Sequence, residues 1–312
     1  MSAPGFRLPF LLQGATIVTI YICRSGREPV TILVAPGLYI LDKPLKIKPS
    51  TGSSRFTIQA LVMPGDMGWT PSKMPVIQCV SDSNREGQLR HASIALAIMR
   101  NGVTIGGLKF LGNPHPLSEY YYAIKRRDSS LKDLEISQCY FIGDRYSAPM
   151  QGGVFAQGRN IRIDHCTFYG CKNAVMIFLG LQNFSLTHSI IYGAYEGALW
   201  YGYGPSADAP FIFDHNIVAQ SHYFFVGYKG IHPNYIFRNS VITGNSFYMG
   251  FNGDIITRDL DNRPHEVNIL KSAKLTLREI TAGAIPLDYL QPAPGTPGAD
   301  LDAGIFIKGG NK

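Results

Sequence analysis

The sequence predicts an all-β fold, a single-stranded right-handed parallel β-helix (solenoid) with an N-terminal cap and an irregular C-terminal tail. Two observations carry this prediction. A pair of short strands recurs along the chain, and no unit of the repeat has a helical period long enough for a crossover helix. Strands that cannot return through a helix must wind round, so that each coil hydrogen-bonds to the next.

The repeat opens with an apolar-x-apolar segment, which is the alternation of a strand with one buried face. Five residues after the first apolar residue comes a single position that precedes a second short strand. In most units a glycine follows this second strand. Units of roughly 23 to 31 residues that contain strands rather than helices indicate stacked β-coils. The units begin at Val103, Leu134, Ile161, Phe184, Phe211 and Tyr235.

One position in each unit is expected to point into the solenoid, where its side chain stacks on the copies in neighbouring coils. Small or weakly polar residues predominate there, which suits a narrow interior. This position holds Leu108, Cys139, Cys166, Ser189, Asn216 and Ser240. A third strand of each coil fits between the repeats, at residues 153–157, 174–178, 198–201, 224–228 and 247–251.

Length and patterning favour one elongated domain. Residues 1–55 are expected to form the N-terminal cap and entry rung, residues 56–254 the rungs, and residues 255–312 a C-terminal rung and a tail that packs on the helix. In solenoids, insertions cluster on one face, and that face usually binds the ligand. Insertions are predicted at residues 66–101, 113–130 and 144–153.

The composition restricts the partners. Only 16% of the 312 residues are charged and the net charge is +7, which favours an anionic partner. No tract is rich in lysine or arginine, so nucleic acid is not expected. No apolar run is long enough to predict a membrane span. We expect an acidic polysaccharide or oligosaccharide as partner, and a monomer.

The low charge and the many glycines and aromatic residues are typical of a secreted all-β protein, so an extracellular or periplasmic location is expected. Arg7 precedes an apolar stretch that resembles a signal peptide, but no clear cleavage site follows it. We interpret this stretch as part of the cap.

Two segments carry a resemblance to a known superfamily. Residues 35–41 read Ala-Pro-Gly-Leu-Tyr-Ile-Leu, and residues 161–168 read Ile-Arg-Ile-Asp-His-Cys-Thr-Phe. The first resembles the opening of right-handed β-helix proteins of the pectin-lyase-like superfamily, and the second resembles a segment of pectate lyases. The resemblance implies the fold, and an activity of the polysaccharide lyase or glycoside hydrolase type.

The chain also departs from the pectate lyase pattern. Pectate lyases follow the second segment with paired aspartates that hold calcium, whereas residues 169–176 contain no carboxylate. Calcium is possible on this fold, but its ligands are absent here, so no cofactor and no metal ligands are predicted. A column of His165, His188 and His215, followed by Asn239, could converge on a metal. The position of this column in a turn explains these residues without a metal.

The candidate chemistry is metal-independent β-elimination on a uronate-containing polysaccharide. Lys229 lies among aromatic residues, where desolvation would lower the pKa of a lysine and suit it to abstract the proton α to a carboxyl group. The residues proposed to assist this chemistry are Tyr201, Tyr228, His222 and Glu196.

Substrate binding is assigned to two kinds of residue. Aromatic and amide side chains would stack on sugar rings and bond their hydroxyls, and cations would neutralise the uronate carboxylate. The predicted residues are Trp200, Tyr203, Phe251, Asn252, Arg126, Arg127, Arg145 and Lys172.

Two alternatives remain open. A glycoside hydrolase needs two opposed carboxylates, and the candidates are Glu196, Asp208, Asp214 and Asp254. A non-catalytic glycan-binding or adhesive β-helix would use the same aromatic residues without chemistry.

Overall fold

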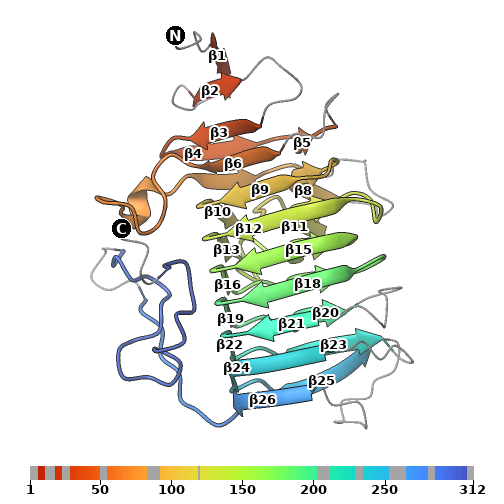
Figure 1. Ribbon diagram of the computed structural model, residues 1–312, viewed down its shortest axis with the longest axis vertical. Coiled ribbons are helices and arrows are strands. Elements are labelled where there is room, and N and C mark those ends of the chain that lie inside the picture. Colours follow the sequence, from red (N-terminus) through yellow and green to blue (C-terminus); the bar gives the residue numbers. More distant parts are fainter. Residues whose placement is uncertain are drawn as a thin grey trace.

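The computed structural model describes residues 6–10, 18–22, 29–49, 55–82, 92–118, 120–201, 211–228, 235–252, 265–279 and 285–307. The chain forms an elongated solenoid in which parallel strands stack along the long axis (Figure 1). An antiparallel pair, β1 (Phe6–Phe10) and β2 (Val18–Ile22), precedes the solenoid. No helix among the described residues is long and apolar enough to cross a membrane.

The first face of the solenoid holds the strands that begin each repeat unit. Each pairs in parallel with its copies in the coils above and below. The strands are β3 (Val30–Val34), β6 (Phe56–Ala60), β9 (Val103–Gly106), β12 (Lys132–Ser137), β15 (Arg159–Asp164), β18 (Gln182–Thr187), β21 (Phe211–Asp214), β24 (Tyr235–Thr243) and β26 (His265–Leu270).

The second face holds shorter strands, and the third face closes each coil. The second comprises β4 (Leu38–Leu41), β7 (Val76–Cys79), β10 (Lys109–Leu111), β13 (Tyr140–Ile142), β16 (Thr167–Tyr169), β19 (Ile190–Tyr192) and β22 (Ile217–Ala219). The third comprises β5 (Leu45–Ile47), β8 (Ala92–Ile98), β11 (Tyr120–Arg126), β14 (Gly152–Ala156), β17 (Asn173–Ile177), β20 (Gly197–Tyr201), β23 (Tyr223–Tyr228) and β25 (Phe247–Asn252).

Two stretches predicted as insertions contribute strands to the coils. Residues 66–101 contain a short 3-10 turn, η1 (Pro71–Lys73), and then β7 and β8, and residues 113–130 contain β11. The two-residue alternation is hidden in β8 because all seven of its residues are buried. A strand covered on both faces reads as a continuous apolar run and cannot be recognised by its period.

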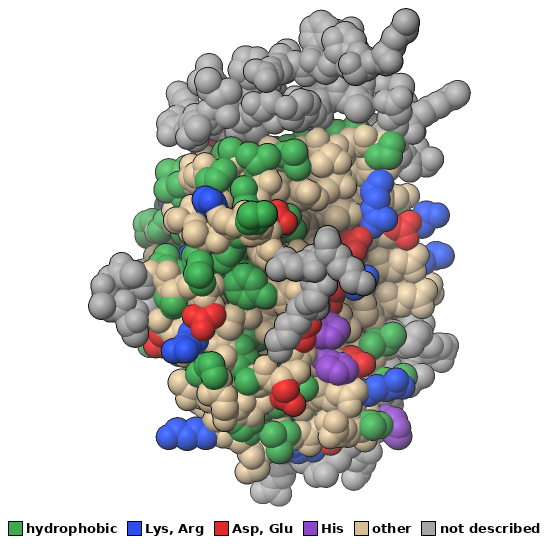
Figure 2. All heavy atoms as spheres, turned by 60° about the vertical axis from the view of Figure 1, so that its left-hand side comes forward, with side chains coloured by type: hydrophobic (Ala, Val, Ile, Leu, Met, Phe, Trp, Pro, Cys, Tyr) green, Lys and Arg blue, Asp and Glu red, His purple; other side chains and the backbone are tan. Residues whose placement is uncertain are grey.

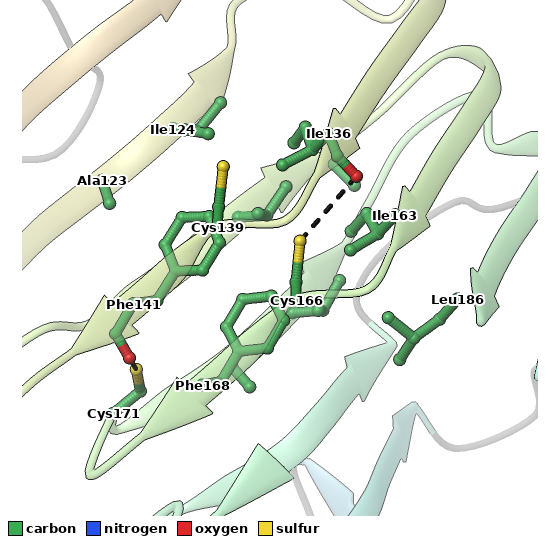
Figure 3. Packing of buried hydrophobic residues seen from close by; sticks show 14 of the residues in the cluster. Ala123, Ile124, Ile136, Cys139, Phe141, Ile163, Cys166, Phe168, Cys171 and Leu186 are labelled. Atoms are coloured by element: carbon green, nitrogen blue, oxygen red, sulfur yellow. Dashed lines mark hydrogen bonds between the residues drawn. The ribbon is translucent and has the colours of Figure 1, made fainter. Parts of the chain in front are cut away.

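The interior is formed by columns of identical positions, as the repeat predicts. The rings of Phe141 and Phe168 stack with centroids 4.5 Å apart, and Cys139 and Cys166 lie side by side in the neighbouring column (Figure 3). Both thiols are fully buried and free.

Lower in the same column, the interior is polar. We call Ser189, Asn216 and Ser240 the polar ladder. The Ser189 amide donates to Asn216 Oδ1 at 2.8 Å, and the Asn216 amide donates to Ser240 Oγ at 2.9 Å. Asn216 Nδ2 also donates to the Leu186 carbonyl at 2.8 Å. Since all three side chains are buried, these bonds satisfy backbone groups that the turn leaves without strand partners.

The turn between the first and second faces has a left-handed residue in each coil. His165, His188 and His215 have φ angles of 50°, 46° and 53°, and Gln138 and Asn239 occupy the same turn in flanking coils with φ of 52° and 43°. Histidine and asparagine are among the non-glycine residues that tolerate this region best. The backbone therefore explains which residue types stand in the column.

After β26, the C-terminal segment turns back and runs along the side of the solenoid toward the N-terminal coils (Figure 1). Residues 285–307 cover the second face. The Ile305 carbonyl accepts a hydrogen bond from Gln138 Nε2 at 2.9 Å, and the Phe306 ring meets the edge of Trp69 at 5.1 Å. Leu290 and Ile305 are fully buried in this contact, so the segment is an integral part of the fold.

Candidate functional site

A pocket of about 450 Å³ lies at the corner where the second face turns into the third. We call it the corner pocket. Two long connections, which include residues 112–118 and 143–151, supply part of its lining, and the short connections of the following coils supply the remainder. The lining residues are Ser118, Tyr121, Arg145, Pro149, Gln151, Lys172, Tyr195 and Glu196.

Strand register places four polar residues in one row along this corner. Gln151, Lys172, Glu196 and His222 each precede the first residue of a third-face strand, and those first residues are paired in register from coil to coil. Adjacent coils are about 4.8 Å apart. The row therefore presents one functional group per coil at a spacing close to that of the strands.

Charges of both signs face each other in the pocket. Lys172 Nζ lies 3.6 Å from Glu196 Oε2, and Asn173 Nδ2 donates to the same carboxylate oxygen at 2.8 Å. The Arg145 guanidinium lies 5.4 Å from the centroid of the Tyr195 ring. Two cations thus converge on a space with one carboxylate in its lining, which suits an anionic ligand.

Two phenols also line the pocket. Burial is the main cause that raises the pKa of Tyr195 to about 12, so its hydroxyl stays protonated and can donate a proton or a hydrogen bond. The Tyr121 hydroxyl is buried and has no hydrogen-bond partner among the described residues. The pocket therefore offers the Tyr195 hydroxyl as a neutral donor beside the two cations.

The outer surface of the third face has aromatic side chains, and Trp200 is the one among them that the sequence predicted for ligand binding. We call Phe155, Phe178 and Trp200 the aromatic platform. The Phe155 and Phe178 rings are stacked at 4.4 Å, and Trp200 meets Phe178 edge-on at 5.5 Å. All three are half-buried. Exposed ring faces of this kind can stack on sugar rings.

Lys125 lies against this platform. Its ammonium nitrogen is 4.7 Å from the centroid of the Tyr122 ring and 4.6 Å from that of Phe155. Burial, with a smaller contribution from the Arg127 charge, lowers the pKa of Lys125 to about 8. The environment that the sequence analysis sought at Lys229 is thus present at Lys125, where the preceding tyrosines at 120–122 give the same signal.

The structure brings together three of the predicted site residues, Arg145, Lys172 and Glu196, in the corner pocket. His222 is exposed and lies in the same row, one coil beyond Glu196. Trp200 lies on the platform. The residues that the sequence analysis missed are Tyr121, Gln151 and Tyr195, and their position just before or within the third-face strands was the available signal.

Two predicted residues point the other way. Tyr201 is 1% exposed and packs in the core, because Trp200 faces outward and the side chains of a strand alternate. Arg126 is 0% exposed, and its guanidinium donates to the carbonyl oxygens of Gln157 and Arg159. Neither side chain can contact a ligand on the surface, so both assignments are corrected.

The other predicted residues lie apart from the pocket or outside the described residues. Lys229 and Tyr203 are outside them, and only the backbones of Tyr228, Phe251 and Asn252 are described. Tyr228 and His222 flank opposite ends of β23, so the predicted cluster is divided between two corners. Arg127 is half-buried just beyond β11, at the end away from the pocket.

Comparisons with known proteins identify the fold. No protein-family model matches the chain, and no curated protein matches it in sequence. Among solved structures, the pectin methylesterase from Aspergillus niger in deglycosylated form aligns with a TM-score of 0.50 at 13% identity, over 85% of this chain and 80% of that chain. The likeness shows the fold, a right-handed parallel β-helix, as the sequence predicts.

Proposed function

We propose that the protein is a carbohydrate-active enzyme that binds an acidic polysaccharide in the corner pocket and cleaves it by metal-independent β-elimination. The observation that carries the proposal is the convergence of Arg145 and Lys172 on one pocket. The solved structure that it resembles is a pectin methylesterase, a protein named for a uronate polysaccharide. That likeness supports the substrate class, whereas the proposed reaction rests on the residues of the pocket.

Each residue has a proposed role in the elimination. Arg145 and Lys172 neutralise the uronate carboxylate, which makes the proton on the adjacent carbon more acidic. His222, in the same row, removes that proton, and the electron pair forms a double bond as the glycosidic bond breaks. Tyr195, protonated because burial raises its pKa to about 12, gives its proton to the departing oxygen.

Hydrolysis fits the described part of the pocket less well. A glycoside hydrolase uses two opposed carboxylates, and Glu196 is the one carboxylate among the described lining residues. It is already engaged by Lys172 and Asn173. Glu196 is therefore proposed to hold Lys172 in place.

The test is incubation with pectate, alginate, glycosaminoglycans and methyl-esterified pectin, with three readouts: ultraviolet absorbance of the unsaturated product, new reducing ends, and released methanol. We expect absorbance and reducing ends to rise together. Reducing ends without absorbance would mean hydrolysis, methanol alone would mean de-esterification, and retention on a pectate column without any product would mean a binder.

Variants test the roles. Arg145→Ala and Lys172→Ala should each raise KM by about tenfold or more, since each removes a charge-assisted contact. His222→Ala should lower kcat by about 10²-fold or more while leaving pectate binding intact. Lys132 is an exposed lysine on the first face, so Lys132→Ala is the matched control and should change neither KM nor kcat. If Lys229→Ala abolishes turnover and His222→Ala does not, the base is Lys229.

A further inference from the structure

We propose that Asp164, His165 and His188 form a binding site for a zinc-type divalent metal ion, at the corner between the first and second faces. One candidate ligand atom from each residue lies within 4.8 Å of the others. This corner is separate from the corner pocket, and the inference stands whether or not the proposed function is correct.

The three groups already lie close together around a common space. His165 Nδ1 is 3.2 Å from Asp164 Oδ2, and His188 Nδ1 is 3.2 Å from Asp164 Oδ1. Ligands bound to one zinc ion at about 2.0–2.2 Å are typically separated by roughly 3–4 Å. The rings of His165 and His188 are stacked, with centroids 4.7 Å apart and an interplanar angle of 13°, so one ring must turn about its side-chain torsions for both nitrogens to point at a shared ion.

His165 provides an independent indication of a missing ligand. Its side chain is 6% exposed, and neither ring nitrogen has a hydrogen-bond partner among the described residues. Buried polar groups are normally satisfied, and one that is not calls for an explanation such as an ion. The left-handed turn accounts for a histidine at this position, but not for two buried ring nitrogens that lie at ion-pair distance from the Asp164 and Asp302 carboxylates and make no hydrogen bond.

Neighbouring side chains hold and orient the candidate ligands. Thr187 Oγ1 donates to Asp164 Oδ1 at 2.6 Å, and Arg162 Nη2 donates to Asp164 Oδ2 at 2.7 Å, which fixes the carboxylate. His165 Nε2 faces Asp302 Oδ2 of the C-terminal segment at 3.7 Å. A carboxylate behind the second nitrogen of a metal-binding histidine is the usual way to orient the ring.

The donor set determines the class of ion. Two imidazoles and one carboxylate suit zinc and similar transition metals, whereas calcium and magnesium prefer sites made of oxygen ligands. Histidine and acidic side chains gather on the side of the solenoid along which the C-terminal segment runs (Figure 2). The Gly304 amide donates to the His188 carbonyl at 2.8 Å, so the ion would bind where that segment meets the coils.

The test is calorimetric titration of untagged, chelator-treated protein with Zn²⁺, with Mg²⁺ and Ca²⁺ as comparison ions. We expect one Zn²⁺ per chain, a rise in the thermal unfolding midpoint on loading, and no binding of the comparison ions at the same concentration. Co²⁺ should give the visible absorption bands of a nitrogen-ligated ion. Absence of stoichiometric Zn²⁺ binding would overturn the proposal.

The histidine column offers a matched pair of variants. His188→Asn removes a ligand but keeps a residue that this turn accepts, as Asn239 demonstrates in a lower coil. It should weaken Zn²⁺ binding about 100-fold or more, and Asp302→Asn by about 10- to 100-fold. His215→Asn makes the same change one coil away, outside the three ligands, and should leave affinity unchanged. Equal affinities in His188→Asn and His215→Asn would also overturn the site. If His188→Asn does not fold, the Co²⁺ spectrum of the unmodified protein decides whether a nitrogen-ligated metal site is present.

Discussion

At the scale of single residues, Lys125 shows how the sheet places a cation in an unfavourable environment. It follows the inward-facing Ile124 and so points outward, onto the rings of Tyr122 and Phe155. Contact with ring faces favours the ammonium ion, while loss of water disfavours it. Burial, with a smaller contribution from the Arg127 charge, lowers the pKa of Lys125 to about 8.

This environment predicts a pH-dependent stability. The pKa of Lys125 is about 8 in the folded protein and that of an unfolded lysine is about 10.4, so between these values the unfolded chain binds more protons. The free energy of unfolding should therefore rise from pH 8 to pH 10. Lys125→Met should be more stable than the unmodified protein at pH 7, and the difference should shrink as the pH approaches 10.

Urea unfolding at a series of pH values measures this difference. Lys132→Met is the control, because Lys132 is exposed on β12 and its replacement relieves little desolvation. A stability difference for Lys125→Met that stays constant from pH 7 to pH 10 would contradict the prediction.

At the scale of the elements, the polar ladder connects three successive coils. Its members accept hydrogen bonds from the backbone of the coil before them, at the turn that joins the first and second faces. In the upper coils, the same position holds the apolar Leu108 and the thiols of Cys139 and Cys166.

Asn216→Ala should be strongly destabilising for this reason. It removes the acceptor of the Ser189 amide and the donor to the Leu186 carbonyl, and both groups are buried. An unsatisfied buried polar group costs about 1–3 kcal/mol, so the loss should be roughly 2–5 kcal/mol. Ile212→Ala, at an exposed position of β21, is the control and should cost much less. Chemical denaturation measures both, and similar losses in the two variants would show that the ladder contributes little.

At the scale of the whole molecule, the C-terminal segment closes the second face of the solenoid. Leu290 and Ile305 pack against outward-facing residues of that face, including Tyr140, Ile190 and Ile217. Those residues stand on the side of their strands that faces away from the solenoid interior. The segment thus provides a second apolar core, outside the coils.

Two isoleucines in the segment test its contribution. Ile305 is 0% exposed and Ile307 is 46% exposed. Ile305→Ala should lower the free energy of unfolding by about 2–5 kcal/mol, the usual range for a buried isoleucine, whereas Ile307→Ala should have a small effect. Thermal unfolding monitored by circular dichroism compares the two, and equal effects would mean that the segment adds little to the stability of the fold.

The fold and the columns follow from the sequence alone. Each coil repeats the same local pattern, and a residue therefore stacks on its copies wherever the register is kept, as Cys139 and Cys166 or His165 and His188 do. The sequence also predicted Arg145, Lys172 and Glu196, which line one pocket, because connections that lengthen a coil or join its faces must lie on the surface.

Only the tertiary structure decided which residues share a corner and which side of a strand faces outward. Tyr201 and Arg126 lie in strands whose residues are largely buried, so their sequence has no polar alternation to indicate direction. Lys125, Tyr195 and His165 each contact a residue more than 20 positions away along the chain, which is Phe155, Arg145 and Asp302 respectively. Local periodicity specifies the coil, whereas burial, pKa and the geometry of a site depend on contacts that form only when the coils and the final segment pack together.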